Sequence, residues 1–277
     1  MPTFTGAAGR VFHDSWQPDG EVRGTVVLLH GNGEHLGLYD ALARRLTEHG
    51  QAVHALDAVG HGRSDGERGV IPSWDLLVDD ARSLARIARA QHPGAPLTLL
   101  GHSGGALAAV LLAMRTPGIA DAVVLSAPPM RSQDWIHEWL ALGEPSIPAG
   151  DPREALSTHP EYADALENDP LTYHDGFRRE TLAAVVATWP EVAAGLADGR
   201  PAVPVLLVHG EADPLVPVEH ARLTADQLPD ARVVTFPGDL HDVLNEHDRD
   251  VVHDAVVAFV DEVVGSDSSK TAAVPAP

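Results

Sequence analysis

Short apolar runs alternate with amphipathic stretches along most of this chain. Runs such as Thr25 to His30 and Leu97 to Leu100 are rich in valine and leucine, which is typical of strands buried on both faces of a sheet. The stretches between them, such as Trp74 to Gln91, repeat apolar residues every three or four positions, as an amphipathic helix does. This alternation predicts an α/β protein with a mostly parallel central sheet flanked by helices.

The same pattern sets the expected bounds of these elements. We expect strands at Arg10 to His13, Thr25 to His30, Ala52 to Leu56, Leu97 to Leu100, Ala122 to Leu125, Val205 to Val208 and Arg232 to Phe236. We expect helices at Leu38 to His49, Trp74 to Gln91, Gly104 to Arg115, Pro217 to Gln227 and His247 to Val264.

The alternation is interrupted once, in residues 128–200. No apolar run in this segment indicates a strand, and prolines divide it into short helical pieces. We therefore expect residues 1–127 and 201–264 to form the core and residues 128–200 to form a helical insertion. Residues 265–277 are small, polar and proline-containing, which predicts a disordered tail. The dividing prolines are Pro145, Pro148, Pro152, Pro160, Pro170 and Pro190.

Composition narrows the classes of function. With 40 acidic and 19 basic residues the net charge is -21, which repels nucleic acid and anionic membrane surfaces. The absence of cysteine excludes disulfides, thiolate metal sites and a cysteine nucleophile. Lys270 is the single lysine, so the folded region has none for a P-loop or a Schiff base. The chain has neither a signal-peptide pattern nor the roughly 20 apolar residues of a membrane span, so we expect a cytoplasmic protein without stable membrane insertion.

The first candidate for chemistry follows the run Leu97 to Leu100. Gly101-His102-Ser103-Gly104-Gly105 is a G-x-S-x-G between an expected strand and an apolar helix. Such a turn projects the serine hydroxyl above the sheet, and the residues two positions away must be small. Gly104 begins the helix, so its amide would point at a developing anion. The pattern predicts Ser103 as a nucleophile, although a glycine-rich turn with an incidental serine would look the same.

A serine nucleophile needs a histidine base and a carboxylate that orients the base. Asp213 follows the run Val205 to Val208, and His241 follows the run Arg232 to Phe236. Both lie beyond the carboxyl ends of expected strands, where ligands bind in open α/β sheets. The order Ser103, Asp213, His241 is that of α/β-hydrolases. Rival residues lie at strand ends or on helical stretches, where a structural role fits them better; they are His209, His220, His247, His253 and Asp57.

The loop after the first long strand, His30-Gly31-Asn32-Gly33, suggests a second oxyanion donor, because in this fold an amide of that loop has this role. We therefore expect the Asn32 and Gly104 amides to form an oxyanion hole. The glycines of this loop together with Asp57 also resemble a dinucleotide-binding fingerprint, so an oxidoreductase is a competing interpretation. That interpretation leaves the serine and its two partners unexplained.

Metal binding is poorly supported by the spacing of histidines. His137-Glu138 is not followed by a histidine at position 141, so it is not an H-E-x-x-H motif. The His-Asp pairs at His241, His247 and His253 do not share a helix face. We expect no metal and no cofactor.

Several motifs spread over the chain combine in a way that is typical of one family. They are HGNGEHLGLYDALARRL from His30, DAVGHGRSDG from Asp57, GHSGG from Gly101, LSAPP from Leu125, NDPLTYHDG from Asn168, LLVHGEADPLVP from Leu206 and FPGDLHDVLNE from Phe236. Together they resemble the monoacylglycerol lipase and lysophospholipase branch of the α/β-hydrolases, which is grouped with serine aminopeptidase-like hydrolases. The resemblance covers nearly all of the chain before residue 265.

The resemblance implies Ser103 as nucleophile, His241 as base, Asp213 as the orienting acid, and the Asn32 and Gly104 amides as the oxyanion hole. It also implies that residues 128–200 form a cap over the active site. The chain departs from the family at Gly104, where many relatives carry methionine. We expect this glycine to remove a side chain from the pocket wall.

In the expected cap, an apolar stripe at helical spacing contains Trp135, Ile136, Trp139 and Leu140. We name Trp135 and Trp139 as candidate substrate contacts, with the alternative that the stripe only docks cap to core. The sequence thus predicts a cofactor-free serine hydrolase that cleaves a monoacylglycerol, a lysophospholipid or a similar small lipophilic ester. A thioesterase, an amidase or peptidase, or an acyl transferase would use the same residues, and a ligand-binding protein without turnover would keep the pocket. The oligomeric state stays open.

Overall fold

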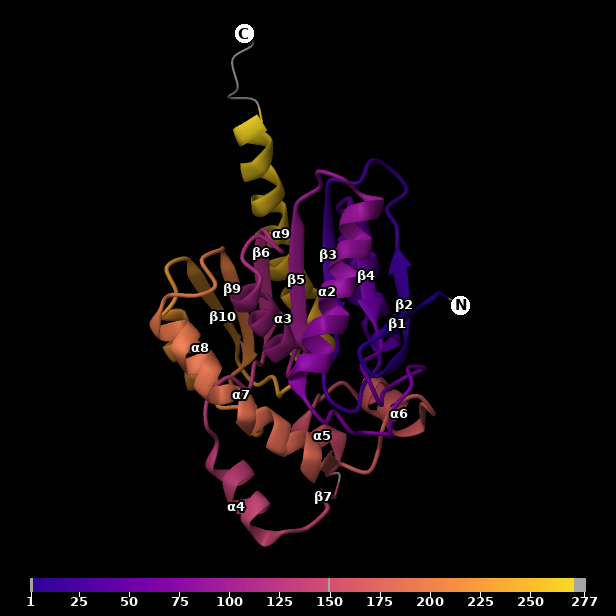
Figure 1. Cartoon of the computed structure of the whole chain (residues 1–277), viewed down its shortest axis with the longest axis vertical. Helices are drawn as coiled ribbons and strands as arrows, with labels where there is room; N and C mark the ends of the chain where they lie inside the picture. The colour runs from indigo at the N-terminus through magenta and orange to yellow at the C-terminus, as the bar shows by residue number, and fades with distance from the viewer. Residues whose placement is uncertain (1, 149, 272–277) are drawn as a thin grey trace.

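A twisted sheet forms the centre of the computed structural model, which describes residues 2–148 and 150–271 (Figure 1). The eight strands lie in the order β1-β2-β4-β3-β5-β6-β9-β10. β2 pairs antiparallel with β1 and β4, and the other neighbours are parallel. The predicted α/β-hydrolase fold with a mostly parallel sheet is confirmed. The strands are β1 (Thr3–Gly6), β2 (Gly9–Trp16), β3 (Gly24–Leu29), β4 (Gln51–Leu56), β5 (Leu97–His102), β6 (Ala122–Ser126), β9 (Val205–Gly210) and β10 (Ala231–Phe236).

Helices cover both faces of this sheet, which explains why its central strands read as continuous apolar runs. One face packs against α2 (Trp74–Gln91), α3 (Gly104–Arg115) and α8 (Val218–Ala225). The other face packs against α1 (Asp40–Glu48) and α9 (Arg249–Thr271). Two short 3-10 helices, η1 (Leu36–Tyr39) and η2 (Val243–Asn245), precede α1 and α9. The bounds of α2 and α3 are those that the sequence predicts.

Both ends of the chain differ from the sequence prediction. β1 is an additional edge strand that pairs with β2; its residues alternate between exposed and half-buried, so it lacks the apolar run of a buried strand. At the other end α9 continues to Thr271, past the predicted boundary at residue 264. The helix thus extends into the segment for which the sequence predicts a disordered tail, and residues 272–277 lie outside the described part of the chain.

The insertion of residues 128–200 lies below the sheet in Figure 1, next to the carboxyl ends of the parallel strands. Pro152 and Pro160 begin helices, at a position where the missing N–H has no helical partner. The short strands β7 and β8 pair antiparallel, which the sequence did not indicate because each has two residues. The elements of the insertion are α4 (Asp134–Leu142), β7 (Ser146–Ile147), α5 (Pro152–Ala155), α6 (Pro160–Asn168), β8 (Phe177–Arg178) and α7 (Arg179–Ala197).

Helix α7 runs through Pro190, although the sequence analysis expects that proline to end a helix. A proline inside a helix costs about 3 kcal/mol because it removes one hydrogen bond and crowds the preceding turn. Packing offsets this cost, since one face of α7 is buried in the main core. The buried residues recur at helical spacing and are Leu182, Val185, Trp189, Val192 and Leu196.

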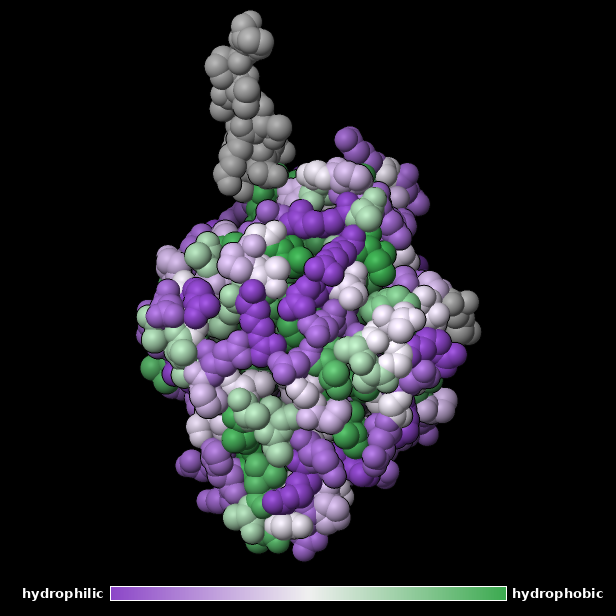
Figure 2. Space-filling model, in the orientation of Figure 1, coloured by the Kyte–Doolittle hydropathy of each residue, from purple (hydrophilic) through white to green (hydrophobic). Residues whose placement is uncertain are grey.

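Helix α4 is less buried than α7. Ile136 is its buried residue, and Leu142 at its end is 71% exposed. Figure 2 shows apolar side chains on the lower part of the molecule, where Figure 1 places α4 and α7. Within residues 2–148 and 150–271, no helix has both the length and the apolar character needed to cross a membrane.

Acid should destabilise this fold through buried histidines near the ends of β3 and β4. Burial lowers the pKa of His30 to about 4 and that of His61 to about 3. Both stay neutral in the fold but bind a proton in the unfolded chain near pH 6.5. Above pH 6.5 the unfolding free energy is therefore not reduced by these two histidines, and below pH 6.5 it falls. Each of the two histidines should lower the unfolding free energy by about 1.4 kcal/mol per pH unit between pH 6.5 and its own pKa in the fold. Urea unfolding at a series of pH values measures this slope.

The variant His61→Asn should show a flatter acid slope than the wild type, because one buried histidine no longer titrates. The matched control is His174→Asn, since His174 is exposed. Its slope should equal that of the wild type. A stability that does not change between pH 7 and pH 5 would contradict the argument.

Candidate active site

Ser103 lies at the sharp turn between β5 and α3, with φ 50° and ψ -118°. This backbone conformation is unusual for a residue other than glycine, and such strain costs on the order of 1–3 kcal/mol. The turn requires glycines on both sides. A Cβ atom at Gly101 would lie 2.4 Å from the backbone of Gly105, and one at Gly105 would lie 2.1 Å from the carbonyl oxygen of Leu29. The small residues that the motif predicts are therefore sterically necessary.

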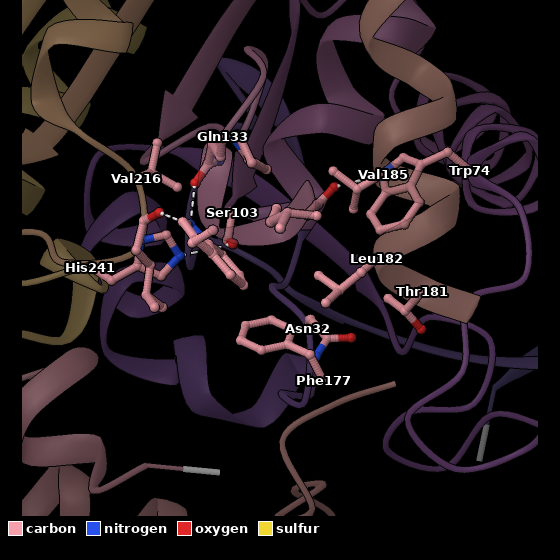
Figure 3. A pocket seen from close by; sticks show the side chains of 15 residues that line it. Asn32, Trp74, Ser103, Gln133, Phe177, Thr181, Leu182, Val185, Val216 and His241 are labelled. Atoms are coloured by element: carbon pink, nitrogen blue, oxygen red, sulfur yellow. Dashed lines mark hydrogen bonds between the residues drawn. The ribbon is translucent and has the colours of Figure 1, made fainter. Parts of the chain in front are cut away.

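The three residues predicted to form a catalytic group lie in one hydrogen-bonded line. His241 Nε2 is 2.9 Å from Ser103 Oγ, and His241 Nδ1 is 2.8 Å from Asp213 Oδ2. Figure 3 shows the serine and the histidine facing each other at the pocket. Because a carboxylate only accepts, Nδ1 carries the hydrogen, which leaves Nε2 free to accept the hydroxyl proton. The arrangement can move a proton from Ser103 to His241.

Asp213 is held as an anion by its donors. Its Oδ1 accepts the backbone N–H groups of Leu215 and Val216 at 2.8 and 2.9 Å, and its Oδ2 lies 3.0 Å from His209 Nε2. Burial alone would raise the pKa of this fully buried carboxyl, but the charge of His241 and these hydrogen bonds outweigh burial and hold the pKa well below its ordinary value. His209, set aside as a structural histidine, thus supports the site through Asp213.

His241 is an unusually basic imidazole. Its side chain is 5% exposed, and burial alone would lower its pKa. The charge and hydrogen bond of Asp213 act in the opposite direction and prevail, so the pKa lies above the ordinary 6.5. Asp242 and Glu34 raise it further by their charge.

The loop that carries His241 rests on the insertion. The His241 N–H donates to the Ala155 carbonyl at 3.3 Å, and the Asp242 N–H donates to the Leu156 carbonyl at 2.8 Å. Ser157 Oγ donates to the Asn245 carbonyl at 3.0 Å. The end of α5 and the residues after it therefore hold this loop in place.

Asn32 and Gly104, predicted as oxyanion donors, lie side by side. Both line the pocket that contains Ser103, and the Asn32 nitrogen is 4.0 Å from the point where a Gly104 Cβ would stand. Gly104 opens α3, and the first N–H groups of a helix have no partner within it. The two backbone amides predicted as donors therefore lie close together beside Ser103.

Trp74 packs beside Gly104. Its Nε1 donates to the Gly104 carbonyl at 3.0 Å, and a Cβ at Gly104 would lie 3.1 Å from the indole ring. The tryptophan therefore forms the pocket wall at this point. Where glycine removes a side chain from the wall, the indole ring of Trp74 lies next to the backbone.

Two adjoining cavities open from the site. The one around Ser103 has a volume of about 40 Å³ and apolar walls that include Leu182 and Val185 (Figure 3). A second cavity of about 560 Å³ lies between the Asn32 loop and the insertion. The two share four lining residues, which are Asn32, Trp135, Phe177 and Leu215.

The two tryptophans predicted as substrate contacts lie in different surroundings. Trp135 lines both cavities, and its Nε1 donates to Gln133 Oε1 at 2.8 Å and to the Leu215 carbonyl at 3.1 Å. Trp139 lines neither of these cavities and packs against the main hydrophobic core. Of the two tryptophans of this stripe, Trp135 therefore lines the cavities, whereas the surroundings of Trp139 do not support the expectation that it contacts the substrate.

Asp57, the rival carboxylate, has a structural role. Its Oδ1 accepts the Leu36 N–H at 2.9 Å and its Oδ2 accepts the Arg63 N–H at 2.8 Å. Both oxygens therefore order neighbouring loops. A ribose, which the dinucleotide-binding interpretation would place on Asp57, would have to displace these amides.

Sequence reasoning missed a buried cluster next to His241, formed by Glu34, His102 and Asp242. One polar atom of each lies within 4.8 Å of the other two. The sequence carries one indication of this cluster, because each of its residues is adjacent or nearly adjacent in sequence to a predicted site residue. Glu34 follows Asn32, His102 precedes Ser103 and Asp242 follows His241.

The family follows from a match along most of the chain. Residues 20–248 match the family model described as serine aminopeptidase, S33. The chain belongs to this family.

Several relatives of this S33 family member are lipases. A monoacylglycerol lipase of Mycolicibacterium smegmatis is 36% identical, over 93% of this chain and 95% of the relative. A monoglyceride lipase of Rattus norvegicus is 29% identical, over 92% of this chain and 88% of the relative. Among solved structures, the monoacylglycerol lipase of Paleococcus ferrophilus superimposes with a TM-score of 0.77 at 28% identity, covering 91% of this chain and 99% of that one.

The variant Asp213→Asn should lower the pKa of His241 by at least about one unit, because the amide carries no charge to stabilise the imidazolium. An NMR titration of the histidine ring measures this shift. Glu211→Gln is the control, since Glu211 is an exposed carboxylate on the same loop. It should leave the titration unchanged, and an equal pKa in Asp213→Asn and wild type would refute the assignment of Asp213 as the dominant charge.

Proposed function

We propose that this protein is a serine hydrolase of carboxylic esters, and that its substrates are monoacylglycerols or similar small lipophilic esters. The observation that carries the proposal is the hydrogen-bonded line of Ser103, His241 and Asp213 at the wall of an apolar cavity. The close relatives named as monoacylglycerol lipases support the choice of substrate.

In the first half of the reaction Ser103 is the nucleophile. His241 Nε2 takes the hydroxyl proton while Oγ bonds to the ester carbonyl carbon. The carbonyl oxygen becomes an anion that the Asn32 and Gly104 amides stabilise. Asp213 keeps the Nδ1–H of the histidine in place and stabilises the imidazolium. The C–O bond to the alcohol then breaks, and His241 returns the proton to the leaving alcohol.

In the second half a water molecule takes the place of the alcohol. His241 removes a proton from this water, whose oxygen bonds to the acyl carbon and forms a second oxyanion at the same two amides. The bond to Ser103 then breaks, and Oγ regains its proton from the histidine. No step requires a metal or a cofactor.

The second cavity is suited to the apolar part of the substrate. It has room for a chain at about 560 Å³, and its walls include Ile147, Leu156 and Leu166 from the insertion. Because these residues come from residues 128–200, we propose that the insertion acts as a cap that contributes the acyl-binding surface. Trp135 lies where the two cavities meet and would contact the chain close to the reacting carbonyl.

Replacing Ser103 by alanine should reduce kcat for ester hydrolysis by a factor on the order of 10⁶, because the covalent route is lost. The melting temperature should change little, since the half-buried hydroxyl contributes little packing. A fluorophosphonate probe should label the wild type and leave Ser103→Ala unlabelled.

The control Ser132→Ala changes an exposed serine of the insertion and should keep both labelling and turnover. Near-normal hydrolysis by Ser103→Ala would remove the proposed mechanism. Labelling of the wild type without turnover of any ester would favour a thioesterase, an amidase or a non-catalytic binding protein, which thioester and anilide substrates distinguish.

A series of p-nitrophenyl esters tests the acyl site. In the wild type kcat/KM should rise about four-fold per methylene while the chain fills the cavity, because each buried methylene contributes about 0.8 kcal/mol. Trp135→Ala should lose more activity on long chains than on acetate. The matched control Trp139→Ala changes the same residue type on the same helix, outside the cavities, and its loss should not depend on chain length. Parallel series for wild type and Trp135→Ala would contradict the assignment.

A further inference from the structure

The buried cluster behind His241 contains two carboxyl groups in close proximity. Glu34 lies in the loop after β3 and is 4% exposed, and Asp242 follows His241 and is fully buried. Their carboxyl groups and His102 each place one polar atom within 4.8 Å of the other two. Two carboxylates that are this close and this buried strongly disfavour a state in which both are charged.

One oxygen of Glu34 is fully engaged. Oε2 accepts the Gly31 N–H at 2.8 Å and the Tyr39 hydroxyl at 2.5 Å. The other oxygen, Oε1, lies 3.6 Å from His102 Nε2, beyond hydrogen-bond distance. Oε2 of Glu34 is therefore hydrogen-bonded within its own region of the chain, while Oε1 faces the cluster without a hydrogen bond to His102.

Asp242 likewise has one oxygen with two donors and one oxygen without a donor. Its Oδ2 accepts the Tyr162 hydroxyl at 2.5 Å and the Asn245 Nδ2 amide at 3.0 Å. Its Oδ1 is buried and has no hydrogen-bond partner in the described part of the chain. A buried oxygen without a partner is costly for an ionised carboxylate, and a proton held within the pair removes that cost.

The groups that face the pair do not neutralise two charges. Burial raises the pKa of both tyrosines well above the ordinary value, so they stay hydroxyl donors. Burial lowers the pKa of His102 well below 6.5, so it stays neutral. No permanent cation is among the facing groups of the described residues, which are Tyr39, Tyr162, His102, His241 and His253.

We propose that Glu34 and Asp242 share a single proton at neutral pH, and that the pair holds the Asn32 loop and the His241 loop together as a positioning device for the reaction. Burial and the charge of Asp242 raise the pKa of Glu34 to about 8, and burial also raises the pKa of Asp242. Both shifts belong to the titration of the pair rather than to either residue alone. The inference rests on the proposed function, because the reaction it positions is ester hydrolysis.

The position of the pair explains how its proton affects the reaction. Glu34 is two residues from Asn32, whose amide faces the oxyanion, and Asp242 is adjacent to the base. When the shared proton leaves, two neighbouring negative charges repel, and the repulsion acts on the two loops that must stay aligned. Activity should therefore fall above about pH 8, through a group that never touches the substrate.

Two isosteric variants test the alkaline side of the kcat/KM profile. In Glu34→Gln the amide oxygen can still accept from Gly31 and Tyr39, and its NH₂ can donate to Asp242. In Asp242→Asn the remaining Glu34 ionises alone. Either variant removes the neighbouring negative charge that helps to hold the proton, so in both the alkaline decline should disappear or move to lower pH. Persistence of this decline in both variants would overturn the proposal.

The double variant Glu34→Gln/Asp242→Asn tests the charge of the pair on the acid side. Each single variant still has one negative charge behind His241, as the wild type does, so its acid limb should stay in place. The double variant has none, and its acid limb should move down by about one pH unit. If both carboxyls were charged in the wild type, each single variant would already shift the limb, and the proposal would fail.

Asp239→Asn is the matched control. Asp239 is a buried carboxyl on the loop of His241, its pKa is raised by burial to about 7, and the groups that act on it are Asp248 and Glu246 rather than the pair. Asp239→Asn should keep both the acid and the alkaline side of the wild-type kcat/KM profile. Loss of the alkaline decline in Asp239→Asn would reassign the decline to that group and overturn the proposal.

Infrared spectroscopy tests the pair without turnover. At neutral pH the difference spectrum of wild type minus either single variant should show the C=O band of a buried protonated carboxyl, because each variant holds one ionised group in place of the pair; Asp239, whose pKa is about 7, contributes equally to both spectra and cancels. Absence of this band refutes the pair even in an active hydrolase. Its presence in a protein without esterase activity would leave the pair standing and refute the proposed function.

A separate test addresses a metal. Loss of the alkaline decline on adding EDTA, and its return with Zn²⁺, would indicate a metal in the cluster and overturn the shared proton.

Discussion

The close approach of α3 to the end of β3 is the constraint on which this site depends. It is possible because Gly105 has no side chain, so the backbone of α3 reaches the Leu29 carbonyl. This contact brings the amide at the start of α3 beside the Asn32 amide, and it turns Ser103 into a strained conformation above the sheet. The position of the hydroxyl is thus determined by backbone packing in the core, where few substitutions are tolerated.

Carboxyl groups of the site differ in charge state because they differ in hydrogen-bond donors. Asp213 is fully buried and stays ionised, since two backbone amides, His209 and His241 all donate to it or lie in position to do so. Asp242 is equally buried but has one oxygen without a partner. Burial by itself does not decide whether an acid is charged in this protein; the neighbouring charges and the donors that reach the acid decide it together.

Most of the sheet could be predicted from the sequence because strands buried on both faces leave long apolar runs, as β3 and β9 do. The turn at Ser103 and the positions of Asp213 and His241 could be predicted because the chemistry proposed for them requires these residues at strand ends. The strand pair β7 and β8 could not, since two residues carry no period. The path of α7 through Pro190 and the closeness of Glu34 to Asp242 depend on tertiary packing between segments far apart in the chain.

The hydrogen bonds between residues 155–157 and the His241 loop have a consequence for how such enzymes diversify. An insertion that only covered a pocket could be exchanged between relatives as a module. Here part of the insertion also holds the His241 loop, so a foreign insertion would change the orientation of this histidine together with the shape of the pocket. Substrate range and catalytic alignment are therefore inherited as one unit, and new specificities should arise more readily by substitutions in α4 than by replacement of the whole segment.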